Sequence, residues 1–124
     1  MFALSKVGLY EKKNFKLKEF SKGMLQRVGI AQLLLNDAKV YFLDEPTYGL
    51  DPLSTKQMRD IILELKKSGK TIFLNTHQVN EVKQICDHIG ILNNGRLIDE
   101  AEVKNITGSI ESYFVKKVLK DGKT

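Results

Sequence analysis

The sequence predicts an α/β fold with a parallel sheet at its core, and three features indicate it. Two short, continuously apolar runs, residues 40–43 and 71–75, have the length and composition of strands buried on both faces. An amphipathic helical pattern lies between them, with short links on either side, and this βαβ arrangement makes the two strands parallel. Two further apolar segments flank Asn94-Gly95, which predicts a C-terminal β-hairpin.

Four helices are expected around these strands, each with an apolar stripe at helical spacing. The first covers about residues 22–36 after the N-cap Ser21, the second begins near Pro52 and stops at Ser68-Gly69, the third covers about 78–87, and the last follows Ser109. Their expected inward residues are, in the same order, Leu25, Val28, Ala31 and Leu35; Met58, Ile61, Ile62 and Leu65; Val79, Val82 and Cys86; and Ile110, Phe114 and Val118.

Length and composition bound the class of protein. The chain has 124 residues, about one small domain, and it is 42% hydrophobic and 28% charged, as in ordinary soluble proteins. No apolar run approaches the roughly 18 residues of a membrane span, and the N-terminus does not read as a secretory signal. The single cysteine, Cys86, forms no internal disulfide, which fits a reducing cytoplasm.

The formal net charge of +5 lies entirely in the first 27 residues, which hold seven lysines and arginines against Glu11 and Glu19. A basic segment suits nucleic acid, anionic lipid or a nucleotide, although scattered lysines are more often a solvated face. The aromatic pattern on which single-stranded nucleic acid stacks is missing from the sequence. We therefore expect no nucleic-acid partner.

Polar side chains follow both predicted strands. Asp44 and Glu45 close the first strand, and Asn75, Thr76 and His77 follow the second. Ligands of parallel α/β sheets bind at the carboxyl ends of the strands, so we expect both groups to meet at one crevice. Two adjacent carboxylates repel each other, and a hard divalent ion such as Mg²⁺ relieves that repulsion.

The ordered series "FSKGMLQR", "VYFLDEPTYGLDP" and "LNTH" resembles the second half of the ATP-binding domain of ABC transporters, and within that family the ABC-2-type exporter ATPases. The resemblance covers about residues 7–114. It implies a partial P-loop NTPase fold of the ABC type, with a parallel sheet core, a C-terminal β-hairpin and flanking helices. It also implies ATP and Mg²⁺ as cofactors.

The resemblance implies a role for each matching residue. Asp44 would hold Mg²⁺ through water, Glu45 would be the general base for ATP hydrolysis, and His77 would contact the γ-phosphate. The signature stretch that would bind the phosphate is Ser21, Lys22, Gly23 and Met24, of which Lys22 and Met24 depart from the consensus glycine and glutamine. Residues 47–51 match the D-loop, with Asp51 among the cofactor-binding residues and Tyr48 at a position more often small or polar.

The P-loop of such ATPases, G-x-x-x-x-G-K-[ST] between a strand and a helix, has no counterpart in the sequence. Ser68-Gly69-Lys70-Thr71 ends correctly, but Glu64 stands where the first glycine is needed, and the segment leads from a helix into a strand. A second candidate, Gly122-Lys123-Thr124, has Lys117 in that position. We therefore expect a C-terminal portion of the domain, with the P-loop strand missing and unpaired strand edges in the sheet.

By the same resemblance, residues 1–36 would be the end of the helical subdomain with the signature, 37–108 the C-terminal part of the ATPase core, and 109–124 a C-terminal helix and tail. The expected function is an ATP-hydrolysing subunit that drives export. Its expected partners are a transmembrane permease, a second ATP-binding subunit and a P-loop-bearing N-terminal half. Its expected place is the cytoplasmic face of the cell membrane.

Two alternatives remain open. The first is a non-catalytic module that docks on an intact ABC ATPase and modulates it; the intact Asp44, Glu45 and His77 argue against it, because such a module has no need of them. The second is a soluble α/β domain of receiver or hydrolase-like type, which accounts for the strands but not for the ordered motifs.

Overall fold

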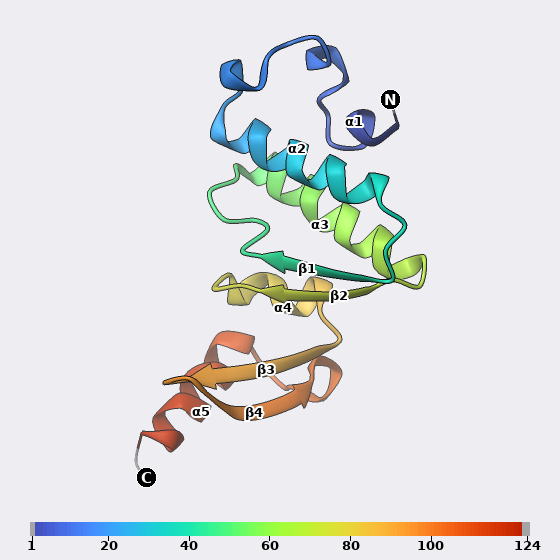
Figure 1. Cartoon of the computed structure of the whole chain (residues 1–124). Coiled ribbons are helices and arrows are strands. Elements are labelled where there is room, and N and C mark those ends of the chain that lie inside the picture. The colour runs from blue at the N-terminus through green and yellow to red at the C-terminus, as the bar shows by residue number, and fades with distance from the viewer. Residues whose placement is uncertain (1, 123–124) are drawn as a thin grey trace. The chain divides into compact units, whose positions relative to one another are not determined.

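The computed structural model describes residues 2–122 (Figure 1). Their elements, in chain order, are α1 (Phe2–Lys6), the 3₁₀ turns η1 (Tyr10–Lys12) and η2 (Leu17–Glu19), α2 (Lys22–Leu35), β1 (Val40–Asp44), α3 (Pro52–Lys67), β2 (Thr71–Asn75), α4 (Val79–Ile85), β3 (His88–Asn93), β4 (Arg96–Glu102), η3 (Val103–Asn105) and α5 (Ile110–Asp121). They form two compact units, one ending at Thr76 and the other beginning at His77. The three-part division at residues 36 and 108 stays a prediction.

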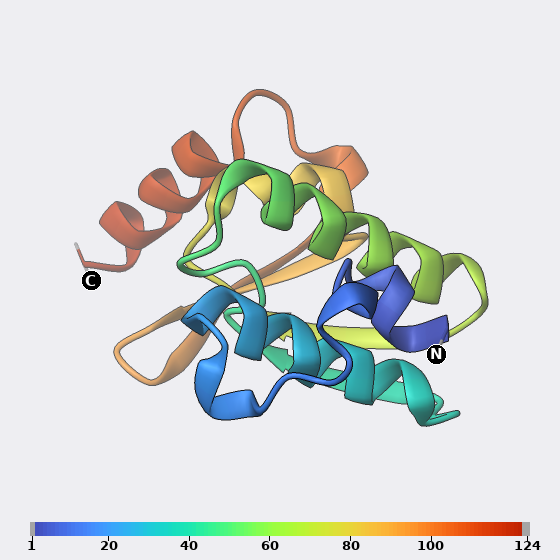
Figure 2. The same ribbon diagram turned by 90° about the horizontal axis from the view of Figure 1, so that it is seen from above.

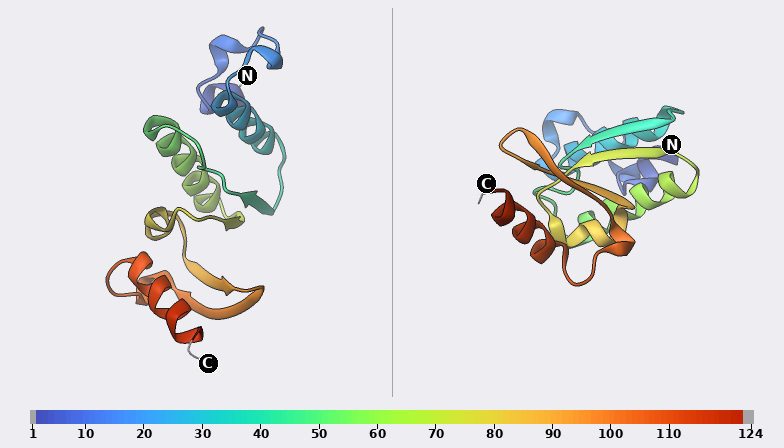
Figure 3. Two further views of the ribbon diagram at one scale, coloured as in Figure 1. Left: turned by 90° about the vertical axis from the view of Figure 1, so that its left-hand side faces the viewer. Right: turned by 90° about the horizontal axis from the view of Figure 1, so that it is seen from below.

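The first unit is built on the predicted βαβ arrangement. Strands β1 and β2 pair in parallel, in a register that runs from Val40 opposite Thr71 to Asp44 opposite Asn75. Helix α3 connects them and packs on β2, and α1 packs on α2. The views from above and below show the helices on one side of the strand pair (Figures 2 and 3). The α/β class and the parallel strands are confirmed.

Local signals set the bounds of α3. The carboxylate of Asp51 accepts hydrogen bonds from the backbone N–H groups of Leu53 (3.2 Å) and Ser54 (3.3 Å), and Pro52 occupies the first turn, where its missing N–H costs nothing. At the other end Gly69 has a φ of +87°, the left-handed conformation that glycine adopts without strain. The predicted apolar stripe holds, since Met58, Ile61 and Ile62 are buried.

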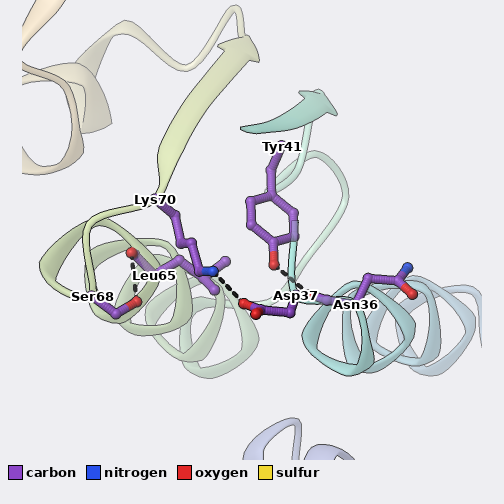
Figure 4. A network of polar contacts seen from close by, with 6 residues as sticks. All are labelled: Asn36, Asp37, Tyr41, Leu65, Ser68 and Lys70. Atoms are coloured by element: carbon purple, nitrogen blue, oxygen red, sulfur yellow. Dashed lines mark hydrogen bonds and ion pairs between the residues drawn. The ribbon is translucent and has the colours of Figure 1, made fainter. Parts of the chain in front are cut away.

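Polar contacts fix the starts of the two strands at the same level (Figure 4). The Lys70 ammonium, just before β2, lies 2.5 Å from a carboxylate oxygen of Asp37, just before β1. The Tyr41 hydroxyl donates to the Asn36 carbonyl at 2.7 Å. Because the strands start level and have equal lengths, their carboxyl ends are level as well.

The prediction that both faces of these strands are buried is wrong for the described residues. Tyr41 is only 4% exposed on the face toward the helices, whereas on the other face Phe42 and Phe73 are 76% and 66% exposed. The two exposed rings lie together, with centroids 5.7 Å apart. The first unit has helices for one face of its sheet only, so the alternate side chains remain in water.

The predicted stripe of α2 is also partly wrong. Ala31 is buried, but Leu25 and Leu35 at the two ends of the stripe are exposed, and Ile30 is buried instead. Helix α1 packs on α2, and the buried residues of α2, Ile30 and Ala31, lie in its C-terminal half.

The second unit pairs a hairpin with two helices. Strands β3 and β4 are antiparallel and turn at Asn94 and Gly95, which both have positive φ, as the sequence predicts. The apolar core of this unit consists of Val82, Val103, Ile106 and Ile110, with Val79, Cys86, Ile89, Ala101 and Tyr113 packed against it. The inward face predicted for α4 is therefore confirmed.

Helix α5 begins after Ser109 as predicted, and Ile110 is buried in the core as predicted, but the inward position of Phe114 is wrong. Phe114 is 38% exposed, and Tyr113 packs on the core in its place. The Tyr113 hydroxyl donates to a carboxylate oxygen of Asp99 on β4 at 2.5 Å, and the Lys117 ammonium lies 3.5 Å from the other oxygen. This polar cluster sets the rotation of the helix, which apolar spacing alone does not reveal.

At acid pH we expect α5 to loosen from β4. The hydrogen bond from Tyr113, aided by the charge of Lys117, holds the pKa of Asp99 below its ordinary value. A carboxyl whose folded pKa is depressed contributes stability above its unfolded pKa of about 3.9 and loses it as the pH falls through the folded pKa. Hydrogen exchange of α5 amides, followed as the pH falls below about 4, measures this loss.

The variant Tyr113→Phe tests the cause. Removing this hydrogen bond is expected to lower the free energy of unfolding at neutral pH by about 0.5–1.5 kcal/mol and to move the acid loosening of α5 to higher pH. Tyr10→Phe, in the other unit, serves as the matched control. An unchanged acid profile in Tyr113→Phe would show that this contact does not hold α5.

Candidate functional site

The carboxyl ends of β1 and β2 bring two predicted residues together. Asp44 lies opposite Asn75 in the parallel register, and the Asn75 side-chain amide donates a hydrogen bond to a carboxylate oxygen of Asp44 at 2.9 Å. Both residues are exposed. The structure thus places the Asp44 carboxylate at the strand tip, oriented by its neighbour and accessible to a ligand.

Glu45 follows directly and begins a turn. Its backbone N–H donates to the Asn75 carbonyl at 2.8 Å, while its φ of +47° is in the left-handed region that residues with side chains seldom adopt. Such strain, of order 1–3 kcal/mol, persists only where the surroundings hold it, and it occurs often at functional sites. The chain therefore leaves the strand abruptly, with the half-buried Glu45 at the bend.

Helix α2 holds this bend from one side. The Gln26 side-chain amide donates to the Pro46 carbonyl at 2.8 Å and lies 3.5 Å from the Glu45 carbonyl. Pro46 and Thr47 are buried. Sequence reasoning did not single out Gln26. The feature that could have indicated it is its position on the same helical face as Gly23, one turn further along the helix.

The signature stretch begins α2 as expected for an N-capped helix. The Ser21 hydroxyl accepts from the Met24 backbone N–H at 3.2 Å, and Lys22 is the first helical residue. Exposed N–H groups at a helix start favour anions. The four predicted phosphate-binding residues, Ser21 to Met24, lie consecutively in this turn. Their role toward a phosphate stays a prediction.

The signature turn also lies beside the stretch that matches the D-loop. The Lys22 ammonium is 5.7 Å from the centre of the Tyr48 ring, a cation–π distance, and a Cβ added to Gly23 would lie 3.8 Å from Leu50. Lys22 and Tyr48 are both departures from the resembled pattern, and the structure brings them into contact. Sequence spacing gave no signal for this pair.

Two predicted site residues have other settings. The Asp51 carboxylate caps α3, and its pKa is lowered by its hydrogen bonds to Ser54; its cofactor role stays a prediction. His77 is exposed and begins the second unit, two residues after β2 ends. Its approach to Asp44 and Glu45 stays a prediction.

The residues at the β1 tip fit a magnesium ion of the kind that nucleotides bring with them. Within residues 2–122, no group of three or more His, Cys, Asp and Glu side chains is placed to hold a metal by itself. Mg²⁺ seldom needs such a cage, because it keeps several waters and is held by one or two carboxylates together with substrate phosphates. An exposed, oriented carboxylate such as Asp44 suits that mode.

Comparison with known proteins shows which family the chain resembles. The sequence model of the family described as "ABC transporter" matches residues 1–48. An ABC transporter ATP-binding protein of Synechocystis, sll0415, is 53% identical over 118 residues, which are 94% of this chain and 33% of that protein. The lantibiotic transport ATP-binding protein SrtF of Streptococcus pyogenes is 40% identical over 116 residues, 94% of this chain and 50% of that protein.

A solved structure titled "Structure of ATP binding subunit of ABC transporter" superposes with a TM-score of 0.84 and 30% identity, covering 93% of this chain and 51% of that one. The chain thus spans a third to a half of the length of these relatives. It belongs to the ABC transporter family of ATP-binding proteins and corresponds to the C-terminal portion of their domain.

Replacing Gln26 tests whether α2 holds the bend at Glu45. In Gln26→Ala the Pro46 carbonyl loses its partner, so we expect the backbone N–H of Tyr48, which bonds to the Glu45 carbonyl at 3.1 Å, to exchange its hydrogen about tenfold faster. Hydrogen exchange measured by NMR reads this amide directly. Gln32→Ala, an exposed position on the same helix, is the control, and equal exchange in both variants would contradict the role of Gln26.

Proposed function

We propose that the chain is part of the ATP-hydrolysing subunit of an ABC exporter, which drives transport through a separate membrane permease. One observation carries the proposal: Asp44 and Glu45 close a strand whose neighbour ends in Asn75, and Gln26 of the signature helix holds the same bend. Among residues 2–122, no helix is long and apolar enough to cross a membrane. The assignment of membrane passage to a separate permease, and of this chain to the cytoplasmic face, is part of the same proposal.

Catalysis of phosphoryl transfer is mostly positioning and charge stabilisation. In the proposed mechanism the Glu45 carboxylate takes a proton from the attacking water, and the bend described above keeps this base in place. Mg²⁺ bound with the nucleotide would neutralise charge on its phosphates, and Asp44 would orient it. The Ser21 turn would receive the terminal phosphate of a nucleotide held by a second subunit, and His77 would complete the contacts to that phosphate.

The export assignment is supported by the names of relatives. SrtF is named for lantibiotic transport, and BcrA of Bacillus licheniformis, 44% identical over 109 residues, for bacitracin transport. The chain covers 50% and 36% of these two proteins. We extend export to this chain as a proposal and assign it no substrate.

A P-loop-bearing N-terminal half is the partner that the proposal requires. Within the described residues β2 pairs with β1 alone, so its other edge is unpaired, and Phe42 and Phe73 are exposed on one face. Unpaired edges and exposed aromatic faces favour association with another segment. Both features support a partner at this sheet.

The variant Glu45→Gln tests the catalytic proposal. With a P-loop-bearing segment of an ABC ATPase supplied in trans, we expect MgATP hydrolysis by the wild-type chain and a loss of about 10²–10⁴-fold in kcat for Glu45→Gln. Nucleotide binding should change little, because the base acts on water. Glu100→Gln, an exposed carboxylate on β4, is the control.

The outcomes separate the proposal from its alternative. Hydrolysis at an unchanged rate in Glu45→Gln would remove this residue from the mechanism. If the complemented chain never hydrolyses ATP but changes the rate of an intact ABC ATPase, the chain is the modulating module instead.

Replacing Phe42 and Phe73 tests the partner surface. In the double variant Phe42→Ser/Phe73→Ser we expect the dissociation constant for the P-loop-bearing segment to rise at least about tenfold, because two aromatic side chains no longer become buried. Isothermal titration calorimetry measures it. Phe114→Ser, on an exposed part of α5, should bind as the wild type does, and equal affinity in all three chains would place the interface elsewhere.

A further inference from the structure

A surface outside the proposed site combines lysines with exposed apolar side chains. We call it the basic loop surface, and its members are Lys12, Lys13, Phe15, Lys16, Leu17 and Lys18. All four lysines are exposed, and so are Phe15 (51%) and Leu17 (57%). Residues 10–20 contain four lysines and two glutamates, which gives this segment a net charge of +2.

The local structure presents these side chains to solvent. Two single-turn 3₁₀ segments, η1 and η2, shape the loop, and it lies across α2 from β1 and β2 within the first unit (Figure 1). Glu19 is engaged within the loop, since its carboxylate accepts from the Lys16 backbone N–H at 2.8 Å. The Glu19 backbone N–H in turn donates to the Lys16 carbonyl at 2.9 Å, so two hydrogen bonds stiffen the loop without using the Lys16 ammonium group.

Two of the lysines lie over aromatic rings of the same loop. The Lys12 ammonium lies 4.5 Å from the centre of the Phe15 ring, and the Lys13 ammonium lies 4.4 Å from the Tyr10 ring. In water these cation–π contacts are weak. The two lysines can therefore leave the rings and bind an anionic partner. A loop that is merely solvated has no need of Phe15 and Leu17, which expose apolar area among its lysines.

We propose that the basic loop surface docks on the surface of an anionic phospholipid bilayer. Lysines are drawn to acidic headgroups, and Phe and Leu side chains enter the boundary between headgroups and acyl chains. A bilayer surface has no fixed shape that the protein must match. An exposed loop without a groove is therefore enough to contact it. The inference does not rest on ATP hydrolysis, because neither Asp44 nor Glu45 takes part in it.

Vesicle sedimentation with the full chain tests the proposal. We expect binding to vesicles of phosphatidylglycerol and phosphatidylcholine, and little binding to phosphatidylcholine alone. Each lysine near an anionic surface is worth roughly fivefold in the partition coefficient. The partition coefficient of the variant K12Q/K13Q/K16Q/K18Q should therefore be lower by roughly several hundredfold.

A matched variant removes the same charge elsewhere. K39Q/K67Q/K116Q/K120Q neutralises four exposed lysines outside the loop and should keep most of the binding. If it loses as much as the loop variant does, attraction of the whole charge explains the binding and the proposal is overturned. Circular dichroism of both chains confirms that they remain folded.

A separate variant tests the apolar side chains. Phe15→Ser/Leu17→Ser should lower partitioning by about tenfold and abolish the part of the binding that survives high salt. Unchanged partitioning of this double variant would overturn docking by insertion. Tighter binding of the wild-type chain to soluble polyglutamate than to the anionic vesicles would overturn the lipid as occupant.

Discussion

The parallel register of β1 and β2 is the constraint on which the candidate site depends. A parallel pair has no tight turn to set its alignment, so the burial of one face of the strands and contacts at their ends set it. At the amino ends, the Lys70–Asp37 ion pair and the Tyr41–Asn36 hydrogen bond align the chain. At the carboxyl ends, Asn75 consequently reaches Asp44. A slip of one residue would exchange the covered and exposed faces of a strand and separate these two side chains.

Around this register, α2 and the turn after β1 form a second layer of organisation. Helix α2 supplies the Ser21 turn at its start and the Gln26 amide one turn later, so a single rigid element relates the proposed phosphate-binding turn to the proposed base. The Lys22–Tyr48 contact adds a weaker link between the same two segments. Positioning of this kind is what phosphoryl transfer requires of a protein.

Features with local causes could be predicted from the sequence. The hairpin at Asn94-Gly95, the start of α3 after Asp51 and the strand 71–75 each depend on a few neighbouring residues. The meeting of Asp44 with Asn75 was also predictable, because parallel strands bring their carboxyl ends to one edge. By contrast, the inward turn of Tyr113 on α5, the hydrogen bonds of Gln26 and the open face at Phe42 depend on distant partners. Periodicity reports that a residue is apolar, but it does not report which surfaces exist to cover it.

The open aromatic face of the strand pair has a consequence for the life of the chain in a cell. Quality-control chaperones and proteases recognise exposed apolar surface, and small changes in its availability alter protein abundance severalfold. In the proposed assembly, the P-loop-bearing segment that covers Phe42 and Phe73 would also hide them from this recognition. Covering this face would thus protect the chain as well as complete the proposed site.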